Sequence, residues 1–190
     1  MLAAGFSTRL GKPKALARVH GVSLLRGTLK LTATLGADEI VAVVPRNAAR
    51  YHIEARGITV QFAGNTQRAL GLASSMHRGI ATARFSRAVL LLPVDLVDLK
   101  ARELVRLISR WRAAPRRVVA RRIGSHGATP VILPRWLYAR ARRIAGDIGV
   151  RELLRQLPAS SLVLVDMPSA AFDIDTPQDL EIARRRRRRP

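Results

Sequence analysis

The sequence predicts an α/β protein, a three-layer α/β/α sandwich around a mostly parallel sheet, and three observations support this. Short β-type runs alternate with helical segments along the 190 residues, which is typical of βαβ units. The run 88–93 (AVLLLP) is continuously apolar, as in a strand buried on both faces of a sheet. Apolar residues make up 48% of the chain and no linker interrupts it, so we expect one domain with a sizeable core.

The elements follow one another in a regular order. The first predicted helix begins at Ser23, a favourable N-cap residue, and ends before Gly36. Apolar residues at helical spacing support the helix at 101–112, and Pro177 suits the first turn of the last helix. Strands are predicted at 39–44, 58–63, 88–93, 117–121, 130–133 and 162–165, and helices at 23–35, 47–55, 74–83, 101–112, 135–144, 150–156 and 177–185.

The composition excludes several classes of protein. There is no cysteine, which excludes disulfides, thiolate metal sites and a cysteine nucleophile, and suits the reducing cytoplasm where we expect the protein. No apolar run of about eighteen residues predicts a membrane span. Aromatic residues make up only 4%, too few for a platform on which nucleic-acid bases stack.

The net charge of +21 is extreme, and six of these charges lie in the arginine run 184–189, so the rest of the chain carries +15. One interpretation is attraction to polyanions such as nucleotides, RNA or anionic lipid. The other is a compositional bias towards arginine together with a self-repelling tail, and we favour it for the run. We therefore expect a domain at 1–183 and a disordered poly-arginine tail at 184–190, with nucleic-acid contact through the tail as the less favoured interpretation.

The first candidate site is the N-terminal string 2–14 (LAAGFSTRLGKPK). Small residues at 3–5 let backbone amides approach a ligand closely, and successive amides in such a loop form a nest for anions. Arg9, Lys12 and Lys14 add positive charge. The string lacks the Walker pattern, and by composition alone a basic surface turn explains it equally well.

The second candidate is Asp95, which directly follows the apolar strand at 88–93. Ligands of α/β sheets bind beyond the carboxyl ends of the strands, and Mg²⁺ favours one or two carboxylates plus substrate phosphates. Asp95 is therefore a candidate metal ligand. The alternative is a helix cap, a role that Asp98 fits better before the helix at 101–112.

The third candidate is the segment 172–180 (FDIDTPQDL). Asp173 and Asp175 lie two apart in an extended segment, so they share a face. Asp179 falls in the first turn of the helix that follows Thr176, where an acidic side chain is stabilising. The alternative is that all three acids only cap this helix.

Together these strings resemble the MobA-like NTP transferases, a family that includes the molybdenum cofactor cytidylyl- and guanylyltransferases. The resemblance rests on LAAGxSxRxGxPK, on the Asp of a D-x-P in which Val97 replaces the Pro, and on DIDTPxDL, and it spans about Leu2 to Ala183. It implies a Rossmann-like fold whose first strand is truncated here to Met1 and Leu2. We expect a misassigned start codon rather than a destabilised fragment.

The resemblance also implies roles for single residues. Arg9, Lys14 and Asp95 are the implied catalytic residues, with Arg9 and Lys14 on the phosphates. Asp95 is the implied metal ligand, joined by Asp173 or Asp175. The segment 124–131 resembles the acceptor-side loop, with Thr129 where a His is common. The implied nucleotide-binding residues are Leu2, Ala3, Ala4, Gly5, Arg9, Lys14, Gly71 and Ser75, with Asn65 in reach of the same pocket.

The sequence thus predicts a Mg²⁺-dependent nucleotidyltransferase. It would move an NMP from an NTP, with CTP or GTP favoured, to a small phosphorylated or hydroxyl acceptor and release pyrophosphate. A molybdopterin-type cofactor, a sugar phosphate and another small metabolite stay open as acceptors. Two alternatives remain: a non-catalytic basic protein that binds nucleotide or nucleic acid on the same fold, and an enzyme inactivated by loss of its first strand.

Overall fold

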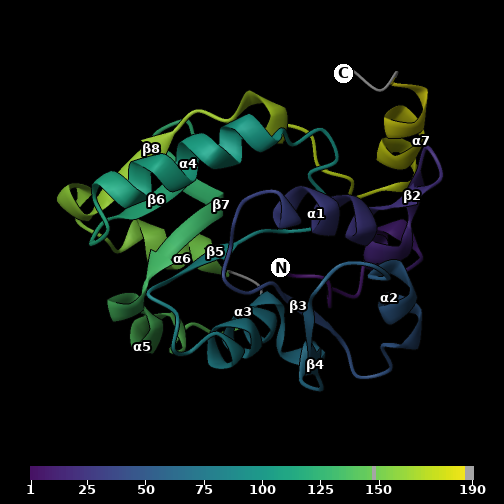
Figure 1. The fold of residues 1–190 in the computed structure, drawn as a ribbon, viewed down its shortest axis with the longest axis horizontal. Coiled ribbons are helices and arrows are strands. Elements are labelled where there is room, and N and C mark those ends of the chain that lie inside the picture. Colours follow the sequence, from purple (N-terminus) through teal and green to yellow (C-terminus); the bar gives the residue numbers. More distant parts are fainter. Residues whose placement is uncertain (147–148, 187–190) are drawn as a thin grey trace.

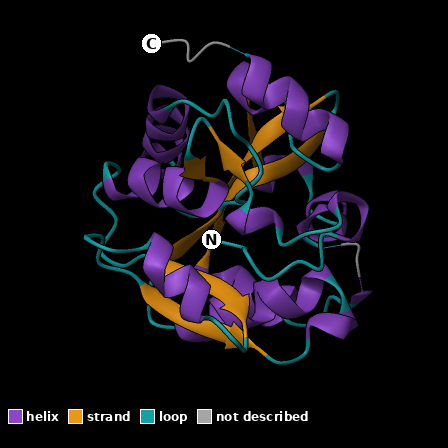
Figure 2. Cartoon of the chain, turned by 90° about the vertical axis from the view of Figure 1, so that its right-hand side faces the viewer, coloured by secondary structure: helices purple, strands orange, loops and turns teal. Residues whose placement is uncertain are grey.

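The computed structural model describes residues 1–146 and 149–186, in which helices cover both faces of a central sheet (Figure 1). The view turned by 90° shows the strands between the helices (Figure 2). The strands are β1 (Arg18–Val19), β2 (Val22–Ser23), β3 (Val41–Pro45), β4 (Gln61–Asn65), β5 (Ala88–Leu91), β6 (Val118–Ile123), β7 (His126–Pro134) and β8 (Leu162–Val165). The α-helices are α1 (Leu24–Ala33), α2 (Ala49–Glu54), α3 (Leu72–Thr82), α4 (Ala101–Ala113), α5 (Tyr138–Ala141), α6 (Val150–Arg155) and α7 (Pro177–Arg185). Short 3₁₀-helices include η1 (Thr8–Leu10), η2 (Lys14–Leu16), η3 (Arg68–Leu70), η4 (Arg135–Leu137) and η7 (Pro168–Ala170).

Residues 1–3 take the central position of the sheet, although only Leu2 forms strand-like bridges there. Leu2 bridges Val43 on one side and Pro93 on the other, both in parallel orientation. Its amide donates to Leu92 O at 3.0 Å, and the amide of Ala3 donates to Val43 O at 2.9 Å. These bonds join the parallel pair β3–β4 to the four-stranded part β5–β7–β6–β8.

The sheet is only partly parallel, so the prediction of a mostly parallel sheet is not confirmed. Strand β7 runs antiparallel to both β5 and β6, whereas β6 and β8 are parallel. The reason is the turn at Gly124 and Ser125: two residues can join only antiparallel strands, and Gly124 has a φ of 58°. This stretch was predicted to be a loop, and the hairpin was not predicted.

A second hairpin, β1–β2, was also missed because its strands are two residues long and carry no periodic signal. Its turn residues His20 and Gly21 both have positive φ. The other predicted strands and helices are present: 162–165 and 177–185 have the predicted ends, and the rest have shifted ends.

The core lies on both faces of the sheet. Val118 and Ala120 face α3, α5 and α6, whereas Val119 between them faces α4, as the alternation of a strand requires. Leu104 and Leu107 of α4 are fully buried on the second face, where α1 and α2 cover β3. No helix in the described part of the chain is long and apolar enough to span a membrane.

The last helix reaches into the segment predicted to be a disordered tail. Arg184 and Arg185 form the end of α7, and Arg186 pairs with Asp98 at 2.5 Å. Residues 187–190 lie outside the described residues.

Asp98 was predicted to cap α4, but it does not. The N-cap is Lys100, because a cap must directly precede its helix and Asp98 comes two residues too early.

The start of α7 carries a capping box. Thr176 Oγ1 accepts from the amide of Asp179 at 3.2 Å, and Asp179 Oδ2 accepts from the amides of Thr176 and Asp175 at 2.8 and 3.1 Å. These bonds lower the pKa of Asp179, the hydrogen bond with the Thr176 side chain most of all. The cap role predicted for Asp179 is confirmed, and the same bonds hold the backbone of Asp175 in place.

Replacing Thr176 by alanine is expected to lower the free energy of unfolding by about 1 kcal/mol, the usual effect of losing an N-cap hydroxyl. Urea denaturation of the variant measures this change. Thr176→Ser keeps the hydroxyl and should retain most of the stability. Equal losses in both variants would mean that the methyl group, not the cap, matters here.

Candidate functional site

The N-terminal loop after Leu2 is shaped by Ser7. Ser7 has a left-handed backbone (φ 55°), and its carbonyl accepts from the amides of Leu10 and Gly11 at 3.0 and 3.1 Å. Its hydroxyl accepts from the amide of Lys14 at 3.0 Å, which closes the loop. Among the described residues no acceptor is recorded for the amides of residues 5–9, so this run of donors is available to an anion. No role was predicted for Ser7.

Arg68, on η3, contacts this loop at Gly5 and Phe6, and no role was predicted for it. Its guanidinium donates to Gly5 O at 3.1 Å and lies over the ring of Phe6, 4.2 Å from the ring centre. Its Nε is buried without a hydrogen-bond partner among the described residues. Only the loop's shape in space could have revealed Arg68, since η3 is about 60 residues away in sequence.

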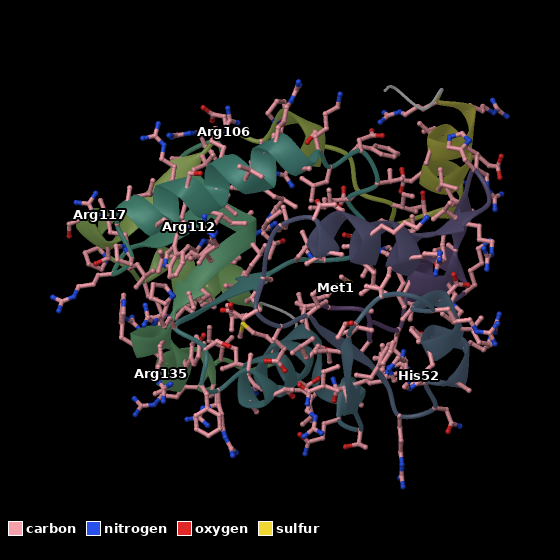
Figure 3. The ribbon with its side chains drawn as sticks, viewed as in Figure 1. Met1, His52, Arg106, Arg112, Arg117 and Arg135 are labelled. Carbon is pink, nitrogen blue, oxygen red and sulfur yellow. The ribbon has the colours of Figure 1, made fainter. Side chains whose placement is uncertain are left out.

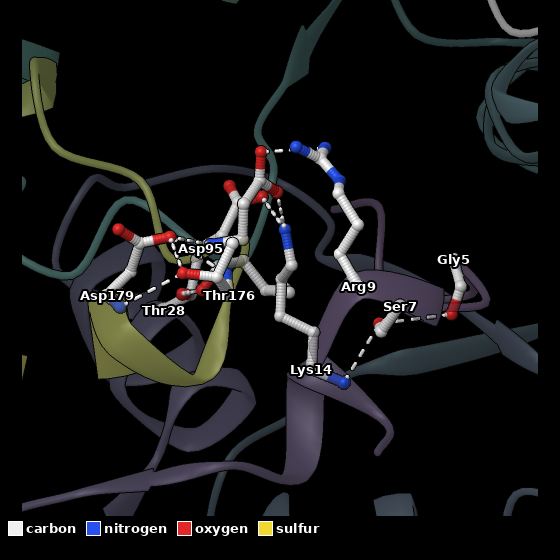
Figure 4. A network of polar contacts seen from close by, with 10 residues as sticks. Gly5, Ser7, Arg9, Lys14, Thr28, Asp95, Thr176 and Asp179 are labelled. Carbon is white, nitrogen blue, oxygen red and sulfur yellow. Dashed lines mark hydrogen bonds and ion pairs between the residues drawn. The ribbon is translucent and has the colours of Figure 1, made fainter. Parts of the chain in front are cut away.

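The centre of the site is Lys14, whose ammonium group lies between two carboxylates (Figure 4). Lys14 Nζ is 2.8 Å from Asp95 Oδ2 and 2.6 Å from Asp175 Oδ1. Arg9 binds the other oxygen of Asp175 at 2.8 Å. The Lys14 side chain is only 16% exposed, whereas that of Arg9 is 70% exposed. The structure thus brings together residues that are up to 166 positions apart in the sequence.

Backbone bonds fix the two acidic segments against each other. The amide of Ile174 donates to Asp95 O at 3.2 Å, which sets Asp175 beside Asp95. Ile174 itself is fully buried. The amide of Val97 also donates to Asp95 O, at 3.0 Å, a bond that the usual proline at position 97 could not make. The turn after Asp95 is therefore held by a hydrogen bond instead of a proline ring.

A buried carboxylate supports the same region from α4. Glu103 accepts from the amide of Ser169 at 3.2 Å and from its hydroxyl at 2.6 Å, and that hydroxyl in turn accepts from the amide of Lys100. These bonds fix η7 just before the acidic segment. Glu103 thus has a structural role that was not predicted from the sequence.

The electrostatics favour the charged forms of Lys14 and Asp175. Burial alone would lower the pKa of Lys14, but the attraction of Asp95 and the hydrogen bonds to Asp175 and Asp95 outweigh it and raise the pKa. Burial opposes ionisation of Asp175 as well, yet Lys14 and Arg9 lower the pKa of this carboxyl below its usual value. The stabilisation that Asp175 gains is present above the pKa of an unfolded aspartate and is lost as the pH falls through the lower folded-state pKa.

The site residues predicted from the sequence fall into two groups. Asp95 and Asp175 meet at Lys14, whereas Asp173 is exposed and makes no hydrogen bond or ion pair within the described residues. Nor does the described part of the chain contain a cluster of three or more His, Asp or Glu side chains around one point. Two carboxylates that already converge on one cation fit Mg²⁺ or Mn²⁺, provided that phosphates and water supply the other ligands.

The residues predicted to line the nucleotide lie on both sides of the loop. Ala3 and Ala4 are buried, and the amides of Leu2 and Ala3 are used by the sheet. Gly71 precedes α3 with a φ of 85°, which favours glycine. Ser75 is buried, and its hydroxyl accepts from Asn65 Nδ2 at 3.0 Å, so Asn65 lies beside Ser75. Thr129, in the predicted acceptor-side loop, precedes a cis proline within β7.

A large cleft of about 1670 Å³ lies next to the ion-pair network of Arg9, Lys14, Asp95 and Asp175. Its wall includes Val94 and Leu96, on either side of Asp95, and the cations Lys100, Arg102 and Arg186. Its lining contains none of the four ion-paired residues, so it adjoins the network without enclosing it.

Comparisons with known proteins identify the family and the fold. Residues 1–161 match the model of the MobA-like NTP transferase domain. No curated protein matches the chain. Among solved structures, Rv0371c from Mycobacterium tuberculosis H37Rv is similar, with 24% identity, a TM-score of 0.77 and coverage of 98% of this chain and 96% of that chain. Another structure of that protein is a complex with manganese, at 22% identity, a TM-score of 0.71 and coverage of 96% and 94%.

Two further structures show the same fold. A nucleotidyl transferase from Methanothermobacter thermautotroptrophicus has 21% identity and a TM-score of 0.78, with coverage of 96% of this chain and 93% of that chain. The molybdopterin-guanine dinucleotide biosynthesis protein A from Archaeoglobus fulgidus has 16% identity and a TM-score of 0.74, with coverage of 96% and 94%.

Proposed function

Because the chain belongs to the MobA-like NTP transferase family, we propose that it is a nucleotidyltransferase that uses Mg²⁺ or a similar divalent cation. It transfers an NMP from an NTP to a small acceptor with a phosphate or hydroxyl nucleophile, and it releases pyrophosphate. CTP and GTP are the nucleotides that we favour. The acceptors to try first are molybdopterin-type cofactors and sugar phosphates.

The observation that supports this proposal best is the ion-pair network beside a loop of free amides. Lys14 lies within 2.8 Å of two carboxylates, and Arg9 reaches the same cluster from the loop. Amides, cations and carboxylates in one place are the parts that phosphoryl and nucleotidyl transfer require.

In the proposed reaction an acceptor oxygen attacks the α-phosphorus of the NTP, and the bond from that phosphorus to the oxygen shared with the β-phosphate breaks. The loop amides at 5–9 orient the triphosphate, and Lys14 and Arg9 stabilise the charge that develops on its oxygens. Asp95 and Asp175 would hold the divalent cation, which neutralises charge on the phosphates when it is bound.

A thermal-shift panel with CTP, GTP, ATP and UTP, each with Mg²⁺, tests the proposal. A nucleotide present at 100 times its Kd should stabilise the protein by about 2.7 kcal/mol. Pyrophosphate release is then measured with the stabilising nucleotide and the panel of acceptors. Absence of stabilisation by all four nucleotides would rule the enzyme proposal out.

The contact of Arg68 with the loop leads to a prediction about affinity. Arg68→Met is expected to raise the Kd of the NTP about three- to tenfold, because the loop loses a hydrogen bond and a cation–π contact that together contribute about 1 kcal/mol or slightly more. Isothermal titration calorimetry measures the change. Arg84→Met is the matched control, since Arg84 also lies over a phenylalanine ring (Phe85, 4.6 Å) but not beside the loop. Equal effects in both variants would show that Arg68 does not act through the loop.

A second candidate function is favoured by the distribution of charge. From residue 104 to 146 the sequence contains eleven arginines and no aspartate or glutamate. Figure 3 shows Arg106, Arg112, Arg117 and Arg135 spread over the half of the molecule that contains α4 and β6. Such a surface suits a polyanion such as RNA.

The salt dependence of binding separates the two candidates. A polyanion-binding protein should bind RNA with an affinity that falls steeply with salt and that drops in the double variant Arg116→Gln, Arg117→Gln. A nucleotidyltransferase should instead discriminate among the four nucleotides and keep this preference in that double variant.

A further inference from the structure

The oxygens that suit a divalent cation are engaged by a cation of the protein itself. Lys14 Nζ lies 2.8 Å from Asp95 Oδ2 and 2.6 Å from Asp175 Oδ1, while Arg9 holds Asp175 Oδ2. The three side chains at the centre are between 16% and 30% exposed, so the ammonium group is largely enclosed. A metal ion bound by the same two oxygens would take the position of the Lys14 ammonium group. Only one of these two cations can therefore be there at a time.

The charges of the network decide which ligands it accepts. Lys14 and Arg9 carry two positive charges, and Asp95 and Asp175 carry two negative charges, so the group is neutral. A divalent cation alone would leave an excess of two positive charges in a partly enclosed site, next to a displaced ammonium group. A triphosphate brings enough negative charge to balance the divalent cation, Lys14 and Arg9 together.

We propose, on the basis of the function proposed above, that Lys14 competes with the divalent cation for Asp95 and Asp175, and that the triphosphate ends this competition by drawing Lys14 to its own oxygens. Divalent cation and triphosphate therefore bind as a coupled pair. Because coupling of equilibria is reciprocal, each ligand raises the affinity for the other by the same factor.

The first test measures the binding of Mn²⁺ alone. The electron paramagnetic resonance signal of the free ion reports how much Mn²⁺ stays unbound. Lys14→Gln is expected to bind Mn²⁺ at least tenfold more tightly than the wild-type protein, although it removes a residue of the site. Lys12→Gln is the matched control: it causes the same change in net charge, but Lys12 is exposed and makes no contact with the carboxylates in the described residues. Equal Mn²⁺ affinities of the two variants would overturn the proposal.

The second test uses inorganic tripolyphosphate with the wild-type protein, so it does not depend on whether a variant folds. Saturating tripolyphosphate is expected to tighten Mn²⁺ binding tenfold or more beyond what complex formation in solution explains, and Mn²⁺ should tighten tripolyphosphate binding equally. In Lys14→Gln, or in Lys14→Met if the first variant does not fold, this coupling should fall below about threefold. Independent binding in the wild-type protein would refute the inference.

Neither test requires a nucleobase, an acceptor or turnover. The proposed function and the proposed competition between Lys14 and the divalent cation can therefore fail separately. Competition between Lys14 and Mn²⁺ without any NTP turnover would reject the proposed enzyme and keep the inference. Turnover of an NTP by the wild-type protein, together with an unchanged Mn²⁺ affinity in Lys14→Gln, would keep the proposed enzyme and reject the inference.

Discussion

Replacing Asp95 by asparagine is expected to lower the rate of pyrophosphate release by a factor of about 10² to 10³, the usual effect of removing one electrostatic contact with the reacting group. Asparagine has the same shape but no charge, so it weakens the hold on the divalent cation while the backbone bonds to Asp95 O remain. The rate is measured with saturating nucleotide, so that reduced binding does not mimic slower chemistry.

Two neighbouring aspartates provide the controls for this prediction. Asp98→Asn lies on the same segment, but its carboxylate pairs with Arg186 outside the network, so its rate should stay within about threefold of wild type. Asp175→Asn should resemble Asp95→Asn, whereas Asp173→Asn should resemble Asp98→Asn, because only Asp175 contacts Lys14. Full activity in Asp95→Asn would refute the mechanism. A large loss of activity in Asp173→Asn would mean that Asp173, not Asp175, is the second carboxylate of the site.

The sequence predicted the parts of the site because each part is a local pattern. A carboxylate after a buried strand, a string of small and basic residues, and an acidic segment before a helix can all be recognised without the fold. The choice between Asp173 and Asp175 could not be made, since two residues on one face of an extended segment differ only in what the rest of the chain brings near them. The bond from Ile174 to Asp95 makes that difference.

The features that were missed depend on contacts between distant segments or on very short elements. Arg68 meets Gly5 only after β3, β4 and residues 1–3 are side by side, and no local pattern marks it. Strand β7 was recognised over 130–133 as an apolar run, but its direction depends on a turn of two residues that also resembles an ordinary loop. Strand direction is thus set by connection length, which a pattern of apolar residues does not report.

The second large effect concerns Lys14 itself. Lys14→Gln is expected to lower the rate of pyrophosphate release by about 10² to 10³ and, unlike Asp95→Asn, to destabilise the fold by about 1–3 kcal/mol, because Asp95 and Asp175 then face each other without a shared cation. Urea denaturation measures the loss of stability at neutral pH. The loss should shrink as the pH falls, since protonation of one carboxyl removes the repulsion.

The double variant Lys14→Gln, Asp95→Asn distinguishes an effect of the network from two separate effects. If Lys14 and Asp95 act as one unit, removing the second charge restores part of the stability, and the rate falls little below that of the slower single variant. Independent roles would instead add both free-energy changes. Additive losses of rate and stability would mean that Lys14 and Asp95 act independently of each other, so that the ion pair between them is not the functional unit.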